Sequence, residues 1–409
     1  MTDNNENKVL NVPHLRFPEF SGEWKKYSFN DIAQYKKGPF GSALKKEIFV
    51  PKSADSVKIY EQQNAIKKDW ELGRYYISRD YFINHMQQFI VEAGDIIVSC
   101  AGTIGEIYEL PPNAVSGVFN QALMRVRINA TLIDKNIFIK VFSSMIDSFS
   151  KIYSNGSAIK NIPPFADLKK TNVFLPTQNE QYKISRLISL LDERIATQNK
   201  IIEKLQSLIK GLSQQLLSSE NDWILYRLDD LAQIKSGYSG TQVSYQTPYK
   251  VSRIETISKH CIDIQRIGYV ECIPESYRLN VGNILFSNIN SIQYIGNTAY
   301  LDKDYGLYHG MNLLRIIPNT TIVRPRFLHL LLCTDWAINH FQTICNKAVS
   351  QASINQTALG KSRFPIPPMS VQQQICSMFE LTERKLDNEQ EYISCLQQQK
   401  RYLLQKMFI

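Results

Sequence analysis

The sequence contains an internal repeat, and this feature constrains the fold more than any other. The segment 24–38, WKKYSFNDIAQYKKG, returns at 223–237 as WILYRLDDLAQIKSG. Three further pairs of segments follow in the same order: 94–99 with 282–287, 104–105 with 295–296, and 123–126 with 313–316. The separations of the pairs range from 188 to 199 residues, so the chain is expected to hold two copies of one domain.

Each copy begins with a region of mixed strand and helix pattern. Short runs of β-branched and aromatic residues, such as 95–99 and 313–317, are separated by Gly, Pro and Asn. This pattern predicts short strands joined by turns. Residues 137–150 and 326–343 are more typical of helices. We therefore predict an α+β class for both globular regions.

Each copy ends in a long helix with a heptad pattern. No Pro occurs between residues 179 and 218, and the only Gly is Gly211. Apolar residues recur in alternating steps of four and three, as in a coiled coil. The seam positions are Ile184, Ile188, Leu191, Ile195, Gln198, Ile202, Leu205, Ile209, Leu212 and Leu216, and, in the second copy, Ile375, Phe379, Thr382, Leu386, Glu389, Ile393, Leu396, Lys400, Leu403 and Met407.

The length of these helices argues for pairing between them. A stripe from 184 to 216 spans roughly 50 Å at the usual helical rise, too long for one small domain to cover. The alternative is that each helix packs alone against its own core. We expect instead an antiparallel coiled coil about a pseudo-twofold axis. Gln198 and Glu389 take equivalent seam positions, so a central polar contact between them is predicted.

Composition excludes several classes of protein. The net charge is +9 and the sequence pI is about 9.0, which favours nucleic acid as a partner. The seven cysteines are odd in number and form no close CxxC pair, so neither a disulfide framework nor a zinc or other metal site is expected. No apolar run is long enough to span a membrane, and residues 1–12 are polar. These features predict a cytoplasmic protein without a membrane partner.

Motifs of common catalytic sites are missing from the sequence. It contains no GxxxxGK[ST], GxGxxG, HExxH or GxSxG motif and no Pro-Asp dipeptide. Asn161-Ile-Pro-Pro-Phe165 is similar to the Asn-Pro-Pro-aromatic motif of adenine methyltransferases, but Ile162 interrupts it. We therefore expect no catalytic residue on this chain, and a standalone adenine methyltransferase is kept as an alternative.

Three groups of short motifs recur in the same order in both copies. They are Trp24 with Asp31-Ile-Ala33 and Gly38-Pro-Phe-Gly-Ser42, then Gly94–Ser99 with Gly102-Thr-Ile-Gly105, then Leu175-Pro176, Glu180-Gln181, Ile184, Leu191-Asp192 and Ile195. The second copy departs from the last group, because it lacks the Glu and the Asp. Through these motifs and their doubled order, the chain resembles the specificity (S) subunit of Type I restriction–modification systems over about residues 13–409.

The resemblance implies a fold and a division into domains. The fold would be two tandem α+β target recognition domains separated by two long conserved helices. The implied boundaries are an N-terminal tail (1–20), target recognition domain one (21–177), a central helix (178–219), target recognition domain two (220–369) and a C-terminal helix (370–409).

The resemblance also implies a function without catalysis. Each domain would read one half of a bipartite, asymmetric site on double-stranded DNA, and the helices would set the spacer. Two modification (methyltransferase) subunits would dock on the helices, and restriction (translocase–nuclease) subunits would then join. This chain would hold no cofactor, and S-adenosylmethionine, ATP and Mg would be bound by the partner subunits.

Candidate DNA contacts are Lys and Arg for phosphates and polar or aromatic side chains on loops for bases. They occupy matching places in both copies, although any single one could be a solvated loop residue. They are Lys36, Lys37, Ser42, Lys45, Lys46, Gln62, Gln63, Asn64, Thr103, Ser157 and Lys160 in the first copy, and Lys235, Tyr238, Ser239, Thr241, Arg253, Asn288, Asn290, Ser291, Gln293, Ser350, Gln351 and Ser353 in the second.

Candidate docking residues lie near the start of the first long helix: Glu180, Gln181, Asp192, Glu193 and Arg194. The other interpretation of these residues is a solvated helix face. A coiled-coil scaffold that holds proteins and never binds DNA is the remaining alternative for the whole chain.

Overall fold

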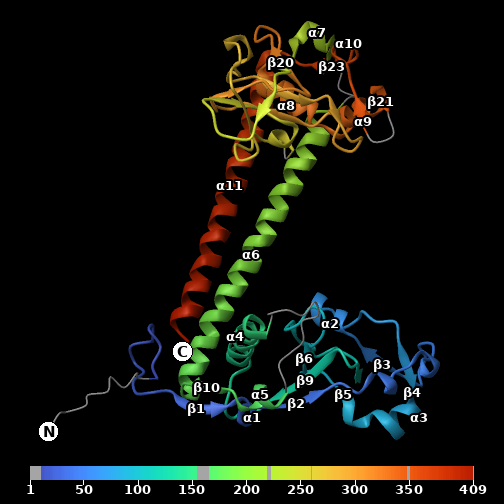
Figure 1. Ribbon diagram of the computed structural model, residues 1–409, viewed down its shortest axis with the longest axis vertical. Helices are drawn as coiled ribbons and strands as arrows, with labels where there is room; N and C mark the ends of the chain where they lie inside the picture. Colours follow the sequence, from blue (N-terminus) through green and yellow to red (C-terminus); the bar gives the residue numbers. More distant parts are fainter. Residues whose placement is uncertain (1–10, 154–164, 219–222, 259, 348–350, 409) are drawn as a thin grey trace, which may run out of the picture. The chain divides into compact units, whose positions relative to one another are not determined.

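The computed structural model describes residues 11–153, 165–218, 223–258, 260–347 and 351–408. The chain divides into two compact units (Figure 1). Unit 1 holds Met1–Ala196 and Cys395–Ile409, and unit 2 holds Thr197–Ser394. Each unit contains a globular head and portions of both long helices. We call residues 25–175 head one and residues 224–366 head two.

Head one is built from two small sheets and a two-stranded ribbon. One sheet has the antiparallel order β2-β9-β6-β7, and the other has the order β4-β3-β8-β5 with β3 and β8 parallel. The ribbon pairs β1 with β10. The elements of this part are β1 (Lys25–Ser28), α1 (Phe29–Ile32), β2 (Ala33–Lys37), β3 (Ser56–Tyr60), α2 (Gln62–Lys67), β4 (Tyr76–Ser78), α3 (Arg79–Tyr81), β5 (Ile90–Val91), β6 (Ile96–Ser99), β7 (Ile107–Glu109), β8 (Gly117–Phe119), β9 (Leu123–Ile128), α4 (Lys135–Tyr153), α5 (Phe165–Lys170), β10 (Asn172–Leu175) and α6 (Gln178–Leu216).

Head two repeats this plan. Its sheets have the orders β12-β20-β16-β18 and β13-β15-β14-β19, again with one parallel pair, β14 and β19, and its ribbon pairs β11 with β23. The elements are β11 (Ile224–Arg227), α7 (Leu228–Leu231), β12 (Ala232–Ser236), β13 (Gln242–Val243), β14 (Tyr249–Val251), β15 (Gly268–Val270), β16 (Ile284–Ser287), β17 (Ile289–Asn290), β18 (Thr298–Tyr300), β19 (Leu307–Tyr308), β20 (Leu313–Pro318), α8 (Pro325–Leu332), α9 (Asp335–Ile344), β21 (Asn346–Lys347), β22 (Ala352–Ser353), α10 (Gln356–Gly360), β23 (Arg363–Ile366) and α11 (Met369–Lys406).

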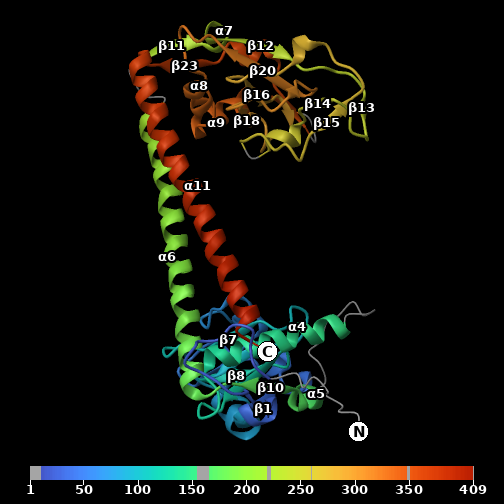
Figure 2. The same ribbon diagram turned by 90° about the vertical axis from the view of Figure 1, so that its left-hand side faces the viewer.

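The main core of each head lies between the antiparallel sheet and the helices that follow it (Figure 2). In head one, Val98 and Val126 pack with Phe138 and Phe142 of α4. Residues 326–343, expected as helix, form two helices, because Thr334 starts α9 by accepting a hydrogen bond from the Ala337 N–H. The α+β prediction is confirmed.

A glycine at equivalent places lets a helix pack closely on each hairpin. Gly105 and Gly296 both have a left-handed backbone, with φ of +82° and +84°. A Cβ at Gly105 would lie 2.9 Å from Ile146, and one at Gly296 would lie 2.6 Å from Phe341. The repeated Ile-Gly pair therefore records a shared packing constraint.

The long helices run antiparallel within each unit. In unit 1, Met407 and Leu403 of α11 pack with Ile184 and Ile188 of α6. In unit 2, Ile209 and Leu216 pack with Ile375 and Phe379, and the Gln198 amide donates to the Glu389 carboxylate. Every seam position named above is buried or partly buried. The prediction of an antiparallel coiled coil is confirmed, and the structure places the two polar seam residues together.

Candidate DNA interface

The basic loop of head one follows β2. Lys36 lies on β2, where its ammonium donates to Gln88 Oε1 at 2.8 Å and lies over the ring of Phe89. Lys37, the last residue of β2, is exposed, and so are Ser42, Lys45 and Lys46 on the loop that follows. The structure therefore brings one group of predicted phosphate contacts onto a single surface, which we call the basic loop (residues 37–46).

The amide run 62–64 divides into three different environments at the start of α2. Gln63 is exposed, so its amide is free to face a ligand. Gln62 donates to the backbone oxygens of Ala101 and Thr103, the latter at 2.9 Å. Asn64 is fully buried and donates to the oxygens of Asp69 and Leu72 at 2.9 and 2.7 Å.

The environment of Asn64 corrects its assignment as a base contact, because its amide closes the turn after α2. Gln62 instead holds the 101–103 turn on which Thr103 is exposed. Ser157, Lys160 and residues 161–164 lie outside the described residues.

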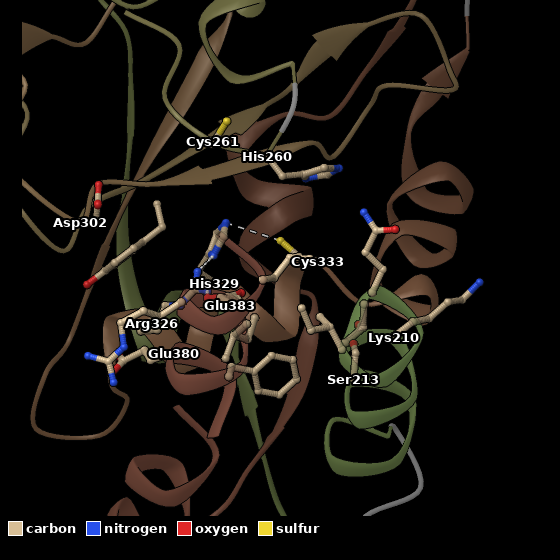
Figure 3. Close-up of a pocket in the computed structure, with 18 of the residues that line it drawn as sticks. Lys210, Ser213, His260, Cys261, Asp302, Arg326, His329, Cys333, Glu380 and Glu383 are labelled. Atoms are coloured by element: carbon tan, nitrogen blue, oxygen red, sulfur yellow. Dashed lines mark hydrogen bonds and ion pairs between the residues drawn. The ribbon is translucent and has the colours of Figure 1, made fainter. Parts of the chain in front are cut away.

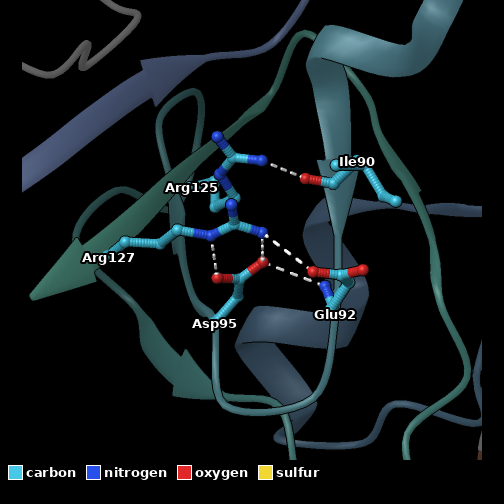
Figure 4. Close-up of polar contacts among 5 residues, drawn as sticks. All are labelled: Ile90, Glu92, Asp95, Arg125 and Arg127. Carbon is cyan, nitrogen blue, oxygen red and sulfur yellow. Dashed lines mark hydrogen bonds and ion pairs between the residues drawn. The ribbon is translucent and has the colours of Figure 1, made fainter.

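A charged cluster between the sheets was missed by the sequence argument (Figure 4). Arg127 donates to both carboxylate oxygens of Asp95, at 2.5 and 2.8 Å, and to Glu92 at 3.2 Å. The hydrogen bond with Asp95 raises the pKa of Arg127. Arg125 donates to the Ile90 oxygen of β5, and burial lowers its pKa. Arg125 therefore links the β2-β9-β6-β7 sheet to the neighbouring sheet.

Head two contains an arginine at the matching place. Arg315 donates to Asn283 Oδ1 at 2.7 Å and to the Ser276 oxygen at 3.3 Å. The signal was present in the sequence, since an Arg recurs in the repeated strands 123–126 and 313–316. Arg125 and Arg315 therefore stabilise the sheets of the two heads, and the candidate DNA-contacting loops project from these sheets.

The matching loop of head two is less basic. Lys235, Ser239 and Thr241 are exposed, whereas Tyr238 is partly buried with its ring 5.3 Å from that of Tyr277. Arg253 is exposed and lies 3.5 Å from Glu255.

A second group of candidates gathers at the small β17-β22-β21 sheet. Asn290 pairs in register with Ala352, next to Ser353 and the exposed Gln351. The amide of Asn290 donates to Ser287 Oγ at 3.1 Å, and that of Asn288 donates to the Ile354 oxygen at 3.4 Å. These two amides therefore support the loop. Ser291 is partly buried, Gln293 is exposed, and Ser350 lies outside the described residues.

Unit 2 also contains a cavity of about 1140 Å³ beside α8 and the two long helices (Figure 3). Arg326 donates to His329 Nδ1 at 2.9 Å, and His329 Nε2 lies 3.5 Å from Cys333 Sγ. Burial lowers the pKa of His329 to about 3 and raises that of the Cys333 thiol to about 11. Arg326 also pairs with Glu383. Burial therefore keeps His329 and Cys333 neutral, and Arg326 is paired within the cavity wall.

The candidate docking residues differ in accessibility. Glu180 is 0% exposed and forms an ion pair with Arg16 at 2.8 Å. Gln181 is 1% exposed: it accepts from the Asp134 N–H at 2.7 Å and donates to the oxygens of Leu132 and Pro176. These two side chains have internal roles, which corrects their assignment as docking residues.

The remaining docking candidates lie further along α6. Asp192 forms an ion pair with Lys400 of α11, and Glu193 and Arg194 are exposed on α6.

Gln372 repeats the contacts of Gln181 in unit 2. It accepts from the Arg324 N–H at 2.7 Å and donates to the oxygens of Ile322 and Pro367 at 3.1 and 2.9 Å. A buried glutamine therefore ties the start of each long helix to its head.

Over the described ranges, no group of three or more His, Cys, Asp or Glu side chains could hold a metal ion, and no helix is long and apolar enough to cross a membrane.

Comparison with known proteins gives matches over nearly the whole chain. The family model of the Type I restriction modification DNA specificity domain matches twice, over residues 21–207 and 220–398. The putative type I restriction enzyme MjaX specificity subunit of Methanocaldococcus jannaschii is 38% identical over 193 residues, which span 46% of this chain and 45% of that protein. The MjaVIII specificity subunit of the same organism is 22% identical over 406 residues, covering 88% of this chain and 85% of that protein.

Two solved structures share the fold. The S subunit of a Type-I restriction-modification system from M. genitalium has a TM-score of 0.55 and 16% identity, covering 97% of this chain and 99% of that one. A chain from a study of complex assembly and conformational transition of the type I R-M system has a TM-score of 0.62 and 14% identity, covering 94% and 97%.

Proposed function

We propose, since this chain belongs to the family of the Type I restriction modification DNA specificity domain and carries two copies of it, that it reads a bipartite, asymmetric site on double-stranded DNA. Each head would read one half of the site. The family is a DNA specificity family, so the methyltransferase alternative built on residues 161–165 is not retained. The relatives are specificity subunits, and the chain is accordingly assigned no reaction of its own.

The proposal rests on one observation: the two heads share the same strand topology but expose different loop residues. The sheets and ribbons of the two heads match, as do the buried glutamines that tie the long helices to them, whereas the exposed loops differ. The basic loop of head one carries Lys37, Lys45 and Lys46, and the loop after β12 carries Ser239 and Thr241. Because base edges are read by individual side chains on such loops, the two half-sites should differ in sequence.

The long helices provide a surface for partner subunits. In unit 2, Leu208 of α6 and Met378 and Leu381 of α11 are exposed apolar residues. We assign this surface to two modification subunits, which would bind S-adenosylmethionine, with restriction subunits supplying the ATP- and Mg-dependent steps.

Methylome sequencing of a host with and without the gene tests the proposal. The expected result is the loss of one split, asymmetric methylated motif when the gene is deleted. An unchanged methylome in a host that expresses the partner subunits would contradict it and favour the protein-scaffold alternative.

Salt dependence of DNA binding tests the basic loop in the assembled complex. Lys45→Ala and Lys46→Ala should each weaken binding to all sequences and reduce the slope of log K against log salt by about one. Lys26→Ala, on the exposed face of β1, is the matched control and should leave the slope unchanged. An equal slope in all variants would remove these lysines from the interface.

A further inference from the structure

Phe40 is the most unusual residue on the basic loop, because it is 91% exposed. In the part of the chain that the structure describes, the next most exposed large hydrophobic residue is Tyr182 at 69%. An isolated apolar residue on a surface is ordinary, but a Phe ring that lies almost entirely in water is not. This ring needs an explanation.

The backbone on both sides of Phe40 is fixed. The Gly38 N–H donates to the Leu123 oxygen at 3.0 Å, and a Cβ at Gly38 would lie 2.0 Å from the Asn120 oxygen, so no other residue fits there. Pro39 is buried and restricts its own φ angle. The backbone conformation of Gly38 and Pro39 therefore fixes the direction of the chain at Phe40.

The residues after Phe40 are held as well. The Ala43 N–H donates to the Phe40 oxygen at 2.9 Å, closing the short 3-10 turn Gly41–Ala43. The hydroxyl of Tyr81 donates to the Ala43 oxygen at 2.9 Å, and Leu44 packs against the core that contains Ile59. The ring is thus presented by an ordered turn, which lowers the entropic cost of inserting it into a partner.

The charges around Phe40 indicate the partner. Lys37, Lys45 and Lys46 are exposed on the same loop, and Glu47 is the one acid within it or next to it. Lysines that flank an apolar ring match the chemistry of duplex DNA, in which phosphates surround stacked bases. Proteins that bend DNA insert apolar side chains between base pairs in this way.

We propose that Phe40 is a wedge that inserts between adjacent base pairs of the half-site bound by head one. This inference rests on the proposed DNA-reading function and adds a mechanism to it. Insertion unstacks one base step, and steps that unstack easily, such as TA and CA, would be favoured there. Phe40 would then contribute to specificity without a hydrogen bond to a base.

The matching loop of head two, residues 237–241, carries no equivalent wedge. Tyr238 follows the matching glycine, Gly237, but its ring packs edge-on against Tyr277 and is only partly exposed. The proposal therefore predicts a distortion in one half-site and none from this loop in the other.

The test uses the full chain assembled with its partner subunits and duplexes that carry the methylated motif found by sequencing. A 2-aminopurine is placed at successive positions of each half-site, because its fluorescence rises when it is unstacked. The wild-type complex should give a rise at one step of the half-site of head one. Phe40→Ala should abolish this rise and weaken binding by about 10- to 100-fold, since stacking on an aromatic ring has that magnitude. The salt slope should not change, because no phosphate contact is lost.

Two further variants separate the possible outcomes. Phe40→Leu keeps an apolar wedge and should retain part of the fluorescence rise. Ile83→Ala removes another exposed apolar side chain of head one and should bind like the wild type. If Phe40→Ala keeps the wild-type affinity and fluorescence, the wedge proposal is wrong, whereas the proposed DNA-reading function still stands. Weaker subunit assembly with unchanged DNA binding would also overturn it and would assign Phe40 to a protein contact. A wild-type complex that prefers no sequence would overturn the proposed function itself.

Discussion

Replacing Gln372 by Ala should loosen the junction between head two and α11. The substitution removes three hydrogen bonds and leaves the Arg324 N–H and the oxygens of Ile322 and Pro367 without their partner. Gln372 is 0% exposed, so water cannot replace these contacts without local opening. Each orphaned buried group costs about 1–3 kcal/mol, and the three together should cost about 3 kcal/mol or more.

Hydrogen exchange measured by mass spectrometry is the suitable assay, because it reports each unit separately. A loss of about 3 kcal/mol corresponds to roughly 100-fold faster exchange of amides that open with the junction, at the start of α11 and in residues 319–330. Gln373→Ala is the matched control: its side chain is exposed and donates to Ser377 Oγ on the same helix, so exchange should be nearly unchanged.

The same experiment on Gln181→Ala distinguishes a structural role from a docking role. Faster exchange at the start of α6 is expected, since Gln181 makes the matching contacts. Unchanged exchange together with lost binding of the modification subunits would refute the structural interpretation of this buried glutamine.

Three further predictions follow from buried or crowded groups. Gly296→Ala should destabilise unit 2 by about 2 kcal/mol or more in urea unfolding, because the new Cβ would meet Phe341 in a left-handed backbone conformation; an unchanged midpoint would contradict this. Replacing Gln198 and Glu389 together by Leu should raise the melting temperature by a few degrees but allow the helix register to vary, which cysteine cross-linking would detect. His309 is buried and its pKa is lowered to about 4, so the unfolded chain binds its proton more readily and stability falls as the pH drops from about 6.5 towards 4. By pH 5 this loss should be about 2 kcal/mol, and His309→Asn should show a smaller difference between pH 7 and pH 5.

The repeat and the helix pair could be predicted because they depend on periodic patterns. A seam that alternates in steps of four and three specifies one helix face whatever the rest of the fold does. The α+β class followed in the same way from short runs of strand-forming residues separated by turn residues. The interruption at Thr334 was not predicted, although Thr followed by Asp is a helix-start signal, because the apolar pattern was interpreted as one continuous helix.

The exposed or buried state of single polar side chains could not be predicted. Gln63 and Asn64 are adjacent amides, yet one is exposed and the other is buried, because the carbonyls that receive the Asn64 amide are brought there by the turn after α2. Glu180 was similarly taken for a surface acid, because its partner Arg16 is more than 160 positions away. Such assignments depend on tertiary contacts that no local pattern contains.

The division of the chain into units also sets the order in which the two units can fold while the chain is being translated. Unit 2 is continuous from Thr197 to Ser394, whereas the core of unit 1 includes Met407 of α11. At about 5–20 residues per second, the residues of unit 2 take roughly 10–40 s to translate, and throughout that time Trp24 lacks Phe408 and Ile184 lacks Met407. Unit 1 is therefore begun first but completed last. A chaperone that binds the nascent chain would meet an incomplete core of unit 1 after unit 2 has been fully translated.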